Sequence, residues 1–291
     1  MSQRITAPSR QAAFAALTVV VTGLVWLYAD VFAALIRQWS NDDDYSHGFF
    51  VIPLAAFFTW ERRDALRRAS RRPSALGLAA VTLGLVCFLA GRFGAELFLT
   101  RVSVIPVLAG LVLFVLGWQH LRILAFPLVF LILMVPLPAI IFNHIAFPLQ
   151  MLASRIGETA IAASGIPVLR EGNMLLLPGR SLEVAEACSG IRSLMSLLML
   201  AIVLGYFTEQ RTSARVLIAL AAVPIAVIAN AARVAGTGLV SYWISPAAAE
   251  GFFHTFSGWL MFVVALAGLL AVHRALELTR VRWSRAREAV C

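Results

Sequence analysis

The chain has 291 residues, of which 60% are hydrophobic and only 13% are charged. Soluble globular domains do not carry so large an apolar fraction, so the composition indicates an all-α polytopic membrane protein, expected as one membrane-embedded domain over residues 1–291. The formal net charge is +9, and its basic residues other than His are all Arg. The three cysteines, Cys87, Cys188 and Cys291, have no paired spacing, which argues against a disulfide framework or a zinc site. No cofactor is expected.

Apolar runs long enough to cross a bilayer follow one another along the chain. A spanning helix needs about 20 mostly apolar residues. Eight runs are expected to span, of which the second is the shortest. They are residues 12–29, 48–60, 74–91, 102–118, 122–142, 188–207, 214–233 and 255–273. The sequence therefore predicts a bundle of about eight transmembrane helices.

The arginines predict how these helices are oriented. They are concentrated in residues 61–72 and in the basic tail, 274–291. Cytoplasmic loops carry an excess of Lys and Arg, so both segments are expected in the cytoplasm, together with the N-terminus. The loop 42–47 and the long segment 143–187 then fall on the opposite, extracytoplasmic side. The positive charge is thus interpreted as a topology signal, and no nucleic-acid partner is expected.

The segment 143–187 is the one sizeable piece expected not to span the membrane. Its first half, residues 147–163, is expected to form an amphipathic helix at the interface. Turn signals at Gly172 and at Pro178-Gly179 divide the second half. The strands are expected over residues 166–170, 173–177 and 181–184. A small β-rich insert is therefore predicted directly before Cys188.

Cys188 is predicted at the first turn of the 188–207 helix. Unsatisfied N–H groups and the positive end of the helix dipole favour a thiolate there. Arg192 follows four residues later, on the same helical face. Glu186, two residues before Cys188, can cap the helix or orient a substrate amine. The alternative for Cys188 is a buried structural cysteine.

Arg233 lies deep in an apolar run, with Asn230 three residues before it. A charged residue inside a span normally faces the bundle interior and serves a function, although an Arg can also extend its head to the interface. Asn230 more often serves helix packing than catalysis. His254 begins the last span, expected at the same membrane face, and His is the side chain best suited to proton transfer near neutral pH.

The loop Asp42-Asp43-Asp44-Tyr45-Ser46-His47-Gly48 is densely polar. Asp44 and His47 are candidate supporting residues of a site on the extracytoplasmic side. Carboxylates and imidazole can also bind a metal ion, but a solvated turn is the simpler interpretation, and no metal is predicted. A zinc protease is disfavoured because the chain has no HExxH motif.

The order of these motifs resembles that of the exosortases, bacterial membrane cysteine transpeptidases of the exosortase/archaeosortase family. The resemblance covers most of the chain. The motifs are Asp44-Tyr45-Ser46-His47-Gly48-Phe49, Val135-Pro136-Leu137-Pro138, Phe147-Pro148-Leu149-Gln150, Gly165-Ile166-Pro167-Val168, Arg170-Glu171-Gly172-Asn173, Val184-Ala185-Glu186-Ala187-Cys188-Ser189-Gly190-Ile191-Arg192, Asn230-Ala231-Ala232-Arg233 and His254-Thr255-Phe256-Ser257-Gly258.

The resemblance implies a function and roles for three residues. Cys188 would be the nucleophile that forms an acyl-thioester, Arg233 the proton donor or oxyanion stabiliser, and His254 the acid/base or a transition-state stabiliser. The implied partners are membrane-anchored proteins with a C-terminal sorting signal, which comprises a Pro-Glu-Pro-type motif, a transmembrane helix and a basic cluster. The implied location is the bacterial inner membrane, with the site at the periplasmic face and a link to exopolysaccharide.

Two alternatives from other classes share the predicted architecture. A polytopic transporter would also have several spans and intramembrane polar residues, but inverted repeats or helices broken at mid-depth would be expected. A non-catalytic scaffold of exopolysaccharide export would tolerate loss of the Cys188 thiol. Within the enzyme hypothesis, an unidentified amine or water would resolve the acyl-enzyme, and the sequence does not choose between transpeptidation and hydrolysis.

Overall fold

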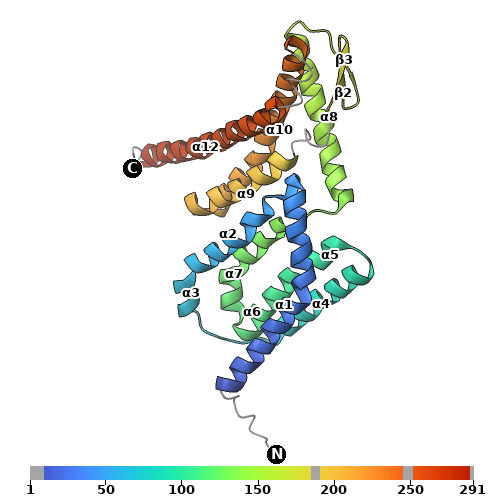
Figure 1. The fold of residues 1–291 in the computed structure, drawn as a ribbon. Helices are drawn as coiled ribbons and strands as arrows, with labels where there is room; N and C mark the ends of the chain where they lie inside the picture. Colours follow the sequence, from blue (N-terminus) through green and yellow to red (C-terminus); the bar gives the residue numbers. More distant parts are fainter. Residues whose placement is uncertain (1–9, 185–190, 245–251, 289–291) are drawn as a thin grey trace, which may run out of the picture. The chain divides into compact units, whose positions relative to one another are not determined.

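The computed structural model describes residues 10–184, 191–244 and 252–288. Helices form most of the described chain, which confirms the all-α fold class (Figure 1). The helices are α1 (Arg10–Asn41), α2 (Gly48–Glu61), α3 (Arg63–Arg68), α4 (Leu76–Phe93), α5 (Leu97–Val102), α6 (Val104–Val115), α7 (Trp118–Phe130), α8 (Ala139–Ala163), α9 (Ile191–Thr208), α10 (Thr212–Trp243) and α12 (Phe252–Glu288), with short 3-10 helices η1 (Asp43–Tyr45) and η2 (Leu131–Met134). The chain forms two compact units, Met1–Leu137 and Pro138–Cys291, and the single domain expected over 1–291 stays a prediction.

In the described chain six helices are long and apolar enough to cross a membrane, or seven if one bent pair counts as a span. The six are Thr18–Asn41, Leu76–Phe93, Leu97–Val115, Ile191–Thr208, Thr212–Trp243 and Phe256–Thr279. The count is lower than the expected eight because two of the expected runs, 48–60 and 122–142, do not each form a single spanning helix. The run 48–60 does form α2, but its 14 residues extend only about 21 Å, less than the core of about 30 Å. The run 122–142 is divided between two helical segments.

The predicted span 122–142 is not one helix. It is divided between the helical segments Trp118–Met134 and Ala139–Ala163, with a break at residues 135–138. The motif Val135-Pro136-Leu137-Pro138 causes the break, because proline lacks an N–H donor and pushes the preceding residue towards extended backbone. Val135 accordingly has φ −92° and ψ 119°. The prolines therefore end one helix and start α8, which is eight residues longer at its N-terminus than the helix expected over 147–163.

In the first unit, α4 packs closely against α5 and α6. Three glycines spaced seven residues apart make this approach possible: a Cβ atom added at Gly77, Gly84 or Gly91 would collide with Phe114, Val107 or Thr100, respectively. Small residues let helix backbones approach closely in membrane proteins. The buried Tyr28 hydroxyl of α1 bonds Ser103 Oγ at 2.9 Å, which ties α1 to this pair.

The end of α1 and the loop 42–47 are held by two backbone carbonyls of η2. Trp39 Nε1 donates to the Met134 carbonyl at 3.0 Å, and His47 Nε2 lies 3.2 Å from the Leu133 carbonyl. At the other end of α2, Arg62 Nη1 donates to the Ile123 carbonyl at 2.7 Å. These bonds place α2 antiparallel to α7 and η2.

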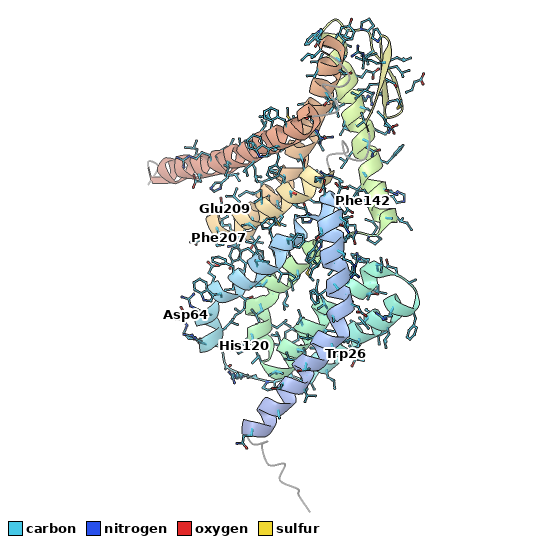
Figure 2. All side chains as sticks on the ribbon, in the orientation of Figure 1. Trp26, Asp64, His120, Phe142, Phe207 and Glu209 are labelled. Carbon is cyan, nitrogen blue, oxygen red and sulfur yellow. The ribbon has the colours of Figure 1, made fainter. Side chains whose placement is uncertain are left out.

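In the second unit, α10 packs against α8, α9 and α12 (Figure 1). Its core is rich in alanine, which lets three helices meet closely. The buried core residues of α9, α10 and α12 are Leu197, Ala201, Ile218, Ala222, Ala226, Ala229, Ala265 and Leu269. At the end of α9 the buried carboxylate of Glu209, labelled in Figure 2, lies 3.5 Å from His273 Nδ1 of α12.

The insert before Cys188 is a three-stranded antiparallel sheet in the order β1-β2-β3, as expected. Its strands are β1 (Leu169–Glu171), β2 (Met174–Leu177) and β3 (Arg180–Glu183). Gly172 and Gly179 turn the chain with φ of 63° and 73°, which glycine adopts without a steric penalty. Leu175 and Leu177 are buried in a cluster with Ile161 of α8 and Val234 of α10. The sheet is thereby fixed to these two helices, beside Arg233.

Candidate active site in the second unit

Arg233 lies inside α10, and the length of this helix indicates its depth. The 32 residues of α10 extend about 48 Å, well beyond a hydrocarbon core of about 30 Å. Arg233 is 21 residues from the first residue, Thr212, so it lies about 30 Å along the helix. If α10 enters the membrane near its N-terminal arginines, Arg211 and Arg215, then Arg233 lies close to the opposite interface.

Arg233 and Asn230 are both buried, with exposed fractions of 9% and 5%. A buried guanidinium is costly, so it is expected to have polar or functional surroundings. Arg233 Cζ would lie 3.6 Å from a Cβ atom added at Gly258 of α12, and its two terminal nitrogens would lie 3.7 and 3.8 Å away. The guanidinium therefore packs over the bare backbone of Gly258.

Gly258 connects Arg233 with the position of His254. The two residues are four apart in α12, so they occupy successive turns on one helical face. The structure thus brings the Arg233 guanidinium to the turn next to the one that carries His254. Sequence reasoning included Gly258 in a motif but gave it no role. The sequence does show that Gly258 follows His254 by four residues. It does not show the contact with Arg233, because that contact depends on how α10 and α12 pack.

Cys188 and Glu186 lie outside the described residues, which stop at Val184 and resume at Ile191. The backbone of Val184 is bonded twice to Asn173: its N–H donates to the Asn173 carbonyl at 2.9 Å, and Asn173 Nδ2 donates to its carbonyl at 3.3 Å. Val184 is buried in the same cluster as Val234, the neighbour of Arg233. Val184 is the last described residue before Cys188, four positions earlier in the sequence.

Asn173 is the second residue whose role sequence reasoning missed. It belongs to the motif Arg170-Glu171-Gly172-Asn173, but its bonds to Val184 join positions 11 residues apart. The predicted relation of Cys188 to Arg192 is not decided. Helix α9 begins at Ile191, and Arg192, its second residue, is exposed. The helical turn expected at Cys188 falls in residues 185–190, outside the described chain.

Asp44 and His47 belong to the first unit, and their part in the site stays a prediction. The Asp44 N–H donates to Asp42 Oδ1 at 3.0 Å, so the Asp42 side chain caps the N-terminus of the 3-10 helix η1. Burial lowers the pKa of His47, so the ring is neutral near pH 7 and Nε2–H donates to Leu133. Burial, with Asp42 and Asp44 nearby, raises the pKa of Tyr45 to about 12. Within the described chain, no three His, Cys, Asp or Glu side chains group to hold a metal.

Comparison with known proteins identifies the family. No curated protein and no solved structure matches the chain significantly. A family model described as transmembrane exosortase matches residues 39–271, which include the polar loop 42–47, the β insert, Arg233 and His254. The match runs across both compact units. With several helices able to cross a membrane and a family match over most of its length, the chain belongs to the transmembrane exosortase family.

Proposed function

We propose that this membrane exosortase cleaves the C-terminal sorting signal of exported proteins through an acyl-thioester on Cys188. The observation that carries the proposal is the packing of the buried Arg233 guanidinium over Gly258, one helical turn from His254. A cation held in a poorly hydrated site is suited to stabilise an oxyanion, because electrostatic contacts are strong there. The anchored Val184 supports it, since the chain leads from there to Cys188 within four residues.

In the proposed reaction, the Cys188 thiolate attacks the carbonyl carbon of the scissile peptide and forms a tetrahedral oxyanion. Arg233 donates hydrogen bonds to that oxyanion, with Arg192 or backbone N–H groups as further donors. The C–N bond then breaks, and His254 gives a proton to the leaving amine. His254 suits this step better than Arg233, because an arginine keeps its proton in proteins. An amine or water then attacks the thioester carbonyl carbon, gives a proton to the neutral His254, and the C–S bond breaks to release the Cys188 thiolate.

The proposed setting follows from charge and family. The enzyme would be a multi-pass protein of the bacterial inner membrane, with both termini in the cytoplasm and its site at the periplasmic face. This orientation requires an even number of spans, since only then does the chain return to its starting side. A substrate helix would enter laterally between spans, and its basic end would set its depth. The Arg-rich tail, 274–291, supports this orientation, whereas the arginines of residues 61–72 fit it only if α2 also crosses the membrane. The exopolysaccharide link rests on the family resemblance alone.

The test compares processing of a tagged protein with a C-terminal sorting signal in cells that carry wild-type enzyme or Cys188→Ala at equal expression. Intact mass and gel mobility are measured. The expected result is removal of the signal by wild type and none by Cys188→Ala, with a thioester adduct accumulating in Arg233 or His254 variants when resolution is slowed. Normal processing by Cys188→Ala would reject the nucleophile, and the scaffold or transporter hypothesis would then take precedence.

A further inference from the structure

We infer that Asp30 of α1 and Arg92 of α4 form a binding site for the headgroup of a zwitterionic aminophospholipid, of the phosphatidylethanolamine type. The two side chains line a cavity of about 340 Å³ in the first unit, together with Trp26, Leu27, Ala29 and Phe88. This volume lies at the lower end of the range of about 300–1,000 Å³ for ligand pockets. The site does not involve the proposed cysteine chemistry.

The position of the pair relative to the apolar runs indicates an interfacial depth. Arg92 lies in the last turn of the span Leu76–Phe93, and the ion pair holds Asp30 at the same depth, although the span Thr18–Asn41 of α1 continues beyond Asp30. Helix α4 has 18 residues and extends about 27 Å, so a charge in its last turn lies at a membrane boundary. Helix α1 extends about 48 Å and must project beyond the core. Phospholipid headgroups occupy this level.

The surroundings of the pair also suit an interface. Trp26 lies one turn before Asp30 and is 81% exposed; Figure 2 labels it on α1. Phe93, next to Arg92, is 86% exposed. Exposed aromatic residues, above all Trp, gather at headgroup level in membrane proteins. Phe88 lies one turn before Arg92. It is buried and packs edge-to-face against Tyr28, so packing holds this lining residue of the cavity in place.

The charges are available to a ligand. Arg92 Nη1 and Asp30 Oδ2 are 3.7 Å apart, a loose ion pair in which the side chains are 56% and 82% exposed. The guanidinium has five donors and the carboxylate accepts on both oxygens, so each group can bind a further partner. Arg92 can bind the phosphodiester, and Asp30 can accept from the ammonium. The neighbouring positive and negative side chains are therefore complementary to a zwitterionic headgroup, which has a negative phosphodiester and a positive ammonium.

This arrangement distinguishes headgroups. Phosphatidylglycerol has the phosphate without a cation, so Asp30 would repel it. Phosphatidylcholine has a cation without N–H donors, so it cannot donate to Asp30. A primary ammonium satisfies both residues. We therefore expect phosphatidylethanolamine to bind more tightly than either of the other lipids, by roughly 1.5- to 5-fold, which is the range for a partly exposed charged contact.

The experiment uses the full-length protein in detergent with the three lipids, each with the same acyl chains, and measures apparent Kd by native mass spectrometry. Asp30→Asn is expected to reduce phosphatidylethanolamine binding to the level of phosphatidylglycerol. Arg92→Gln is expected to weaken binding of all three lipids. Free phosphoethanolamine, tested as a competitor, should bind far more weakly, because the proposed ligand is a lipid.

Glu277→Gln is the matched control, since Glu277 forms an exposed ion pair with Arg274 at 2.8 Å on α12. It should keep the wild-type lipid preference. Equal affinities of wild type for the three lipids would overturn the proposal, as would a preference that survives both Asp30→Asn and Arg92→Gln. Tightest binding of phosphatidylglycerol would overturn it in favour of a simple anion site. Cleavage of the sorting signal is not the readout, so these outcomes leave the proposed function untouched.

Discussion

Substitutions of Gly258 test whether processing depends on the position of the Arg233 guanidinium, because they should move that group without destabilising the fold. A Cβ atom at residue 258 would lie 3.6 Å from Arg233 Cζ, an ordinary van der Waals distance. Gly258→Ala therefore fits beside the guanidinium, and it should stabilise α12 by roughly 0.5–1 kcal/mol because alanine favours a helix more than glycine does. Its processing activity should stay near that of wild type.

Gly258→Val adds two methyl groups beyond that contact. The Cβ atom already fills the available distance, so the methyl groups must displace the guanidinium. Valine is no worse than glycine as a helix former, so stability should change little. If Arg233 stabilises the oxyanion, processing should fall roughly 10²-fold, as when one oxyanion donor is removed from a hydrolase.

The assay measures the initial rate of sorting-signal removal in cells and the thermal unfolding of each purified variant in detergent. Gly236→Val is the control: Gly236 lies three residues after Arg233 on α10, and a Cβ atom there would meet nothing within 4 Å. The reasoning is refuted if folded Gly258→Val processes substrate at the wild-type rate. It is equally refuted if Gly236→Val loses as much activity as Gly258→Val.

Two further predictions concern the chain beside Cys188 and the polar loop. Asn173→Ala removes the amide donor to the Val184 carbonyl and should cost about 1 kcal/mol in unfolding free energy, measured by chemical denaturation, together with slower processing; an unchanged rate would show that this bond does not position Cys188. Burial lowers the pKa of His47, so the unfolded chain binds a proton that the folded chain does not as pH falls below about 6.5. Thermal stability between pH 7.5 and 5 should therefore decrease with falling pH, and less so in His47→Gln; identical pH slopes would contradict this.

Local patterns in the sequence were sufficient for many elements. Gly172 and Pro178-Gly179 marked the turns of the insert, because a positive φ or a preset φ is a property of the residue itself. The apolar runs marked the long helices, because a bilayer core requires about 20 apolar residues whatever their neighbours are. The motifs also led to the family, which the match over residues 39–271 confirms.

Other features depended on residues distant in sequence. The break at Val135-Pro136-Leu137-Pro138 was hidden by the apolar residues around it, since hydropathy does not register the missing N–H of proline. Likewise, α10 continues ten residues beyond Arg233 because the sheet and α8 pack against its end.

By itself, the sequence determined the membrane class, the order of the helices, the β insert and the candidate residues Cys188, Arg233 and His254. Only the tertiary structure placed the Arg233 guanidinium over Gly258, bonded Asn173 to Val184 and paired Asp30 with Arg92. The physical reason is the range of the interactions. Hydropathy and turn preferences act within a few residues, whereas side chains from different helices meet only after the helices have packed.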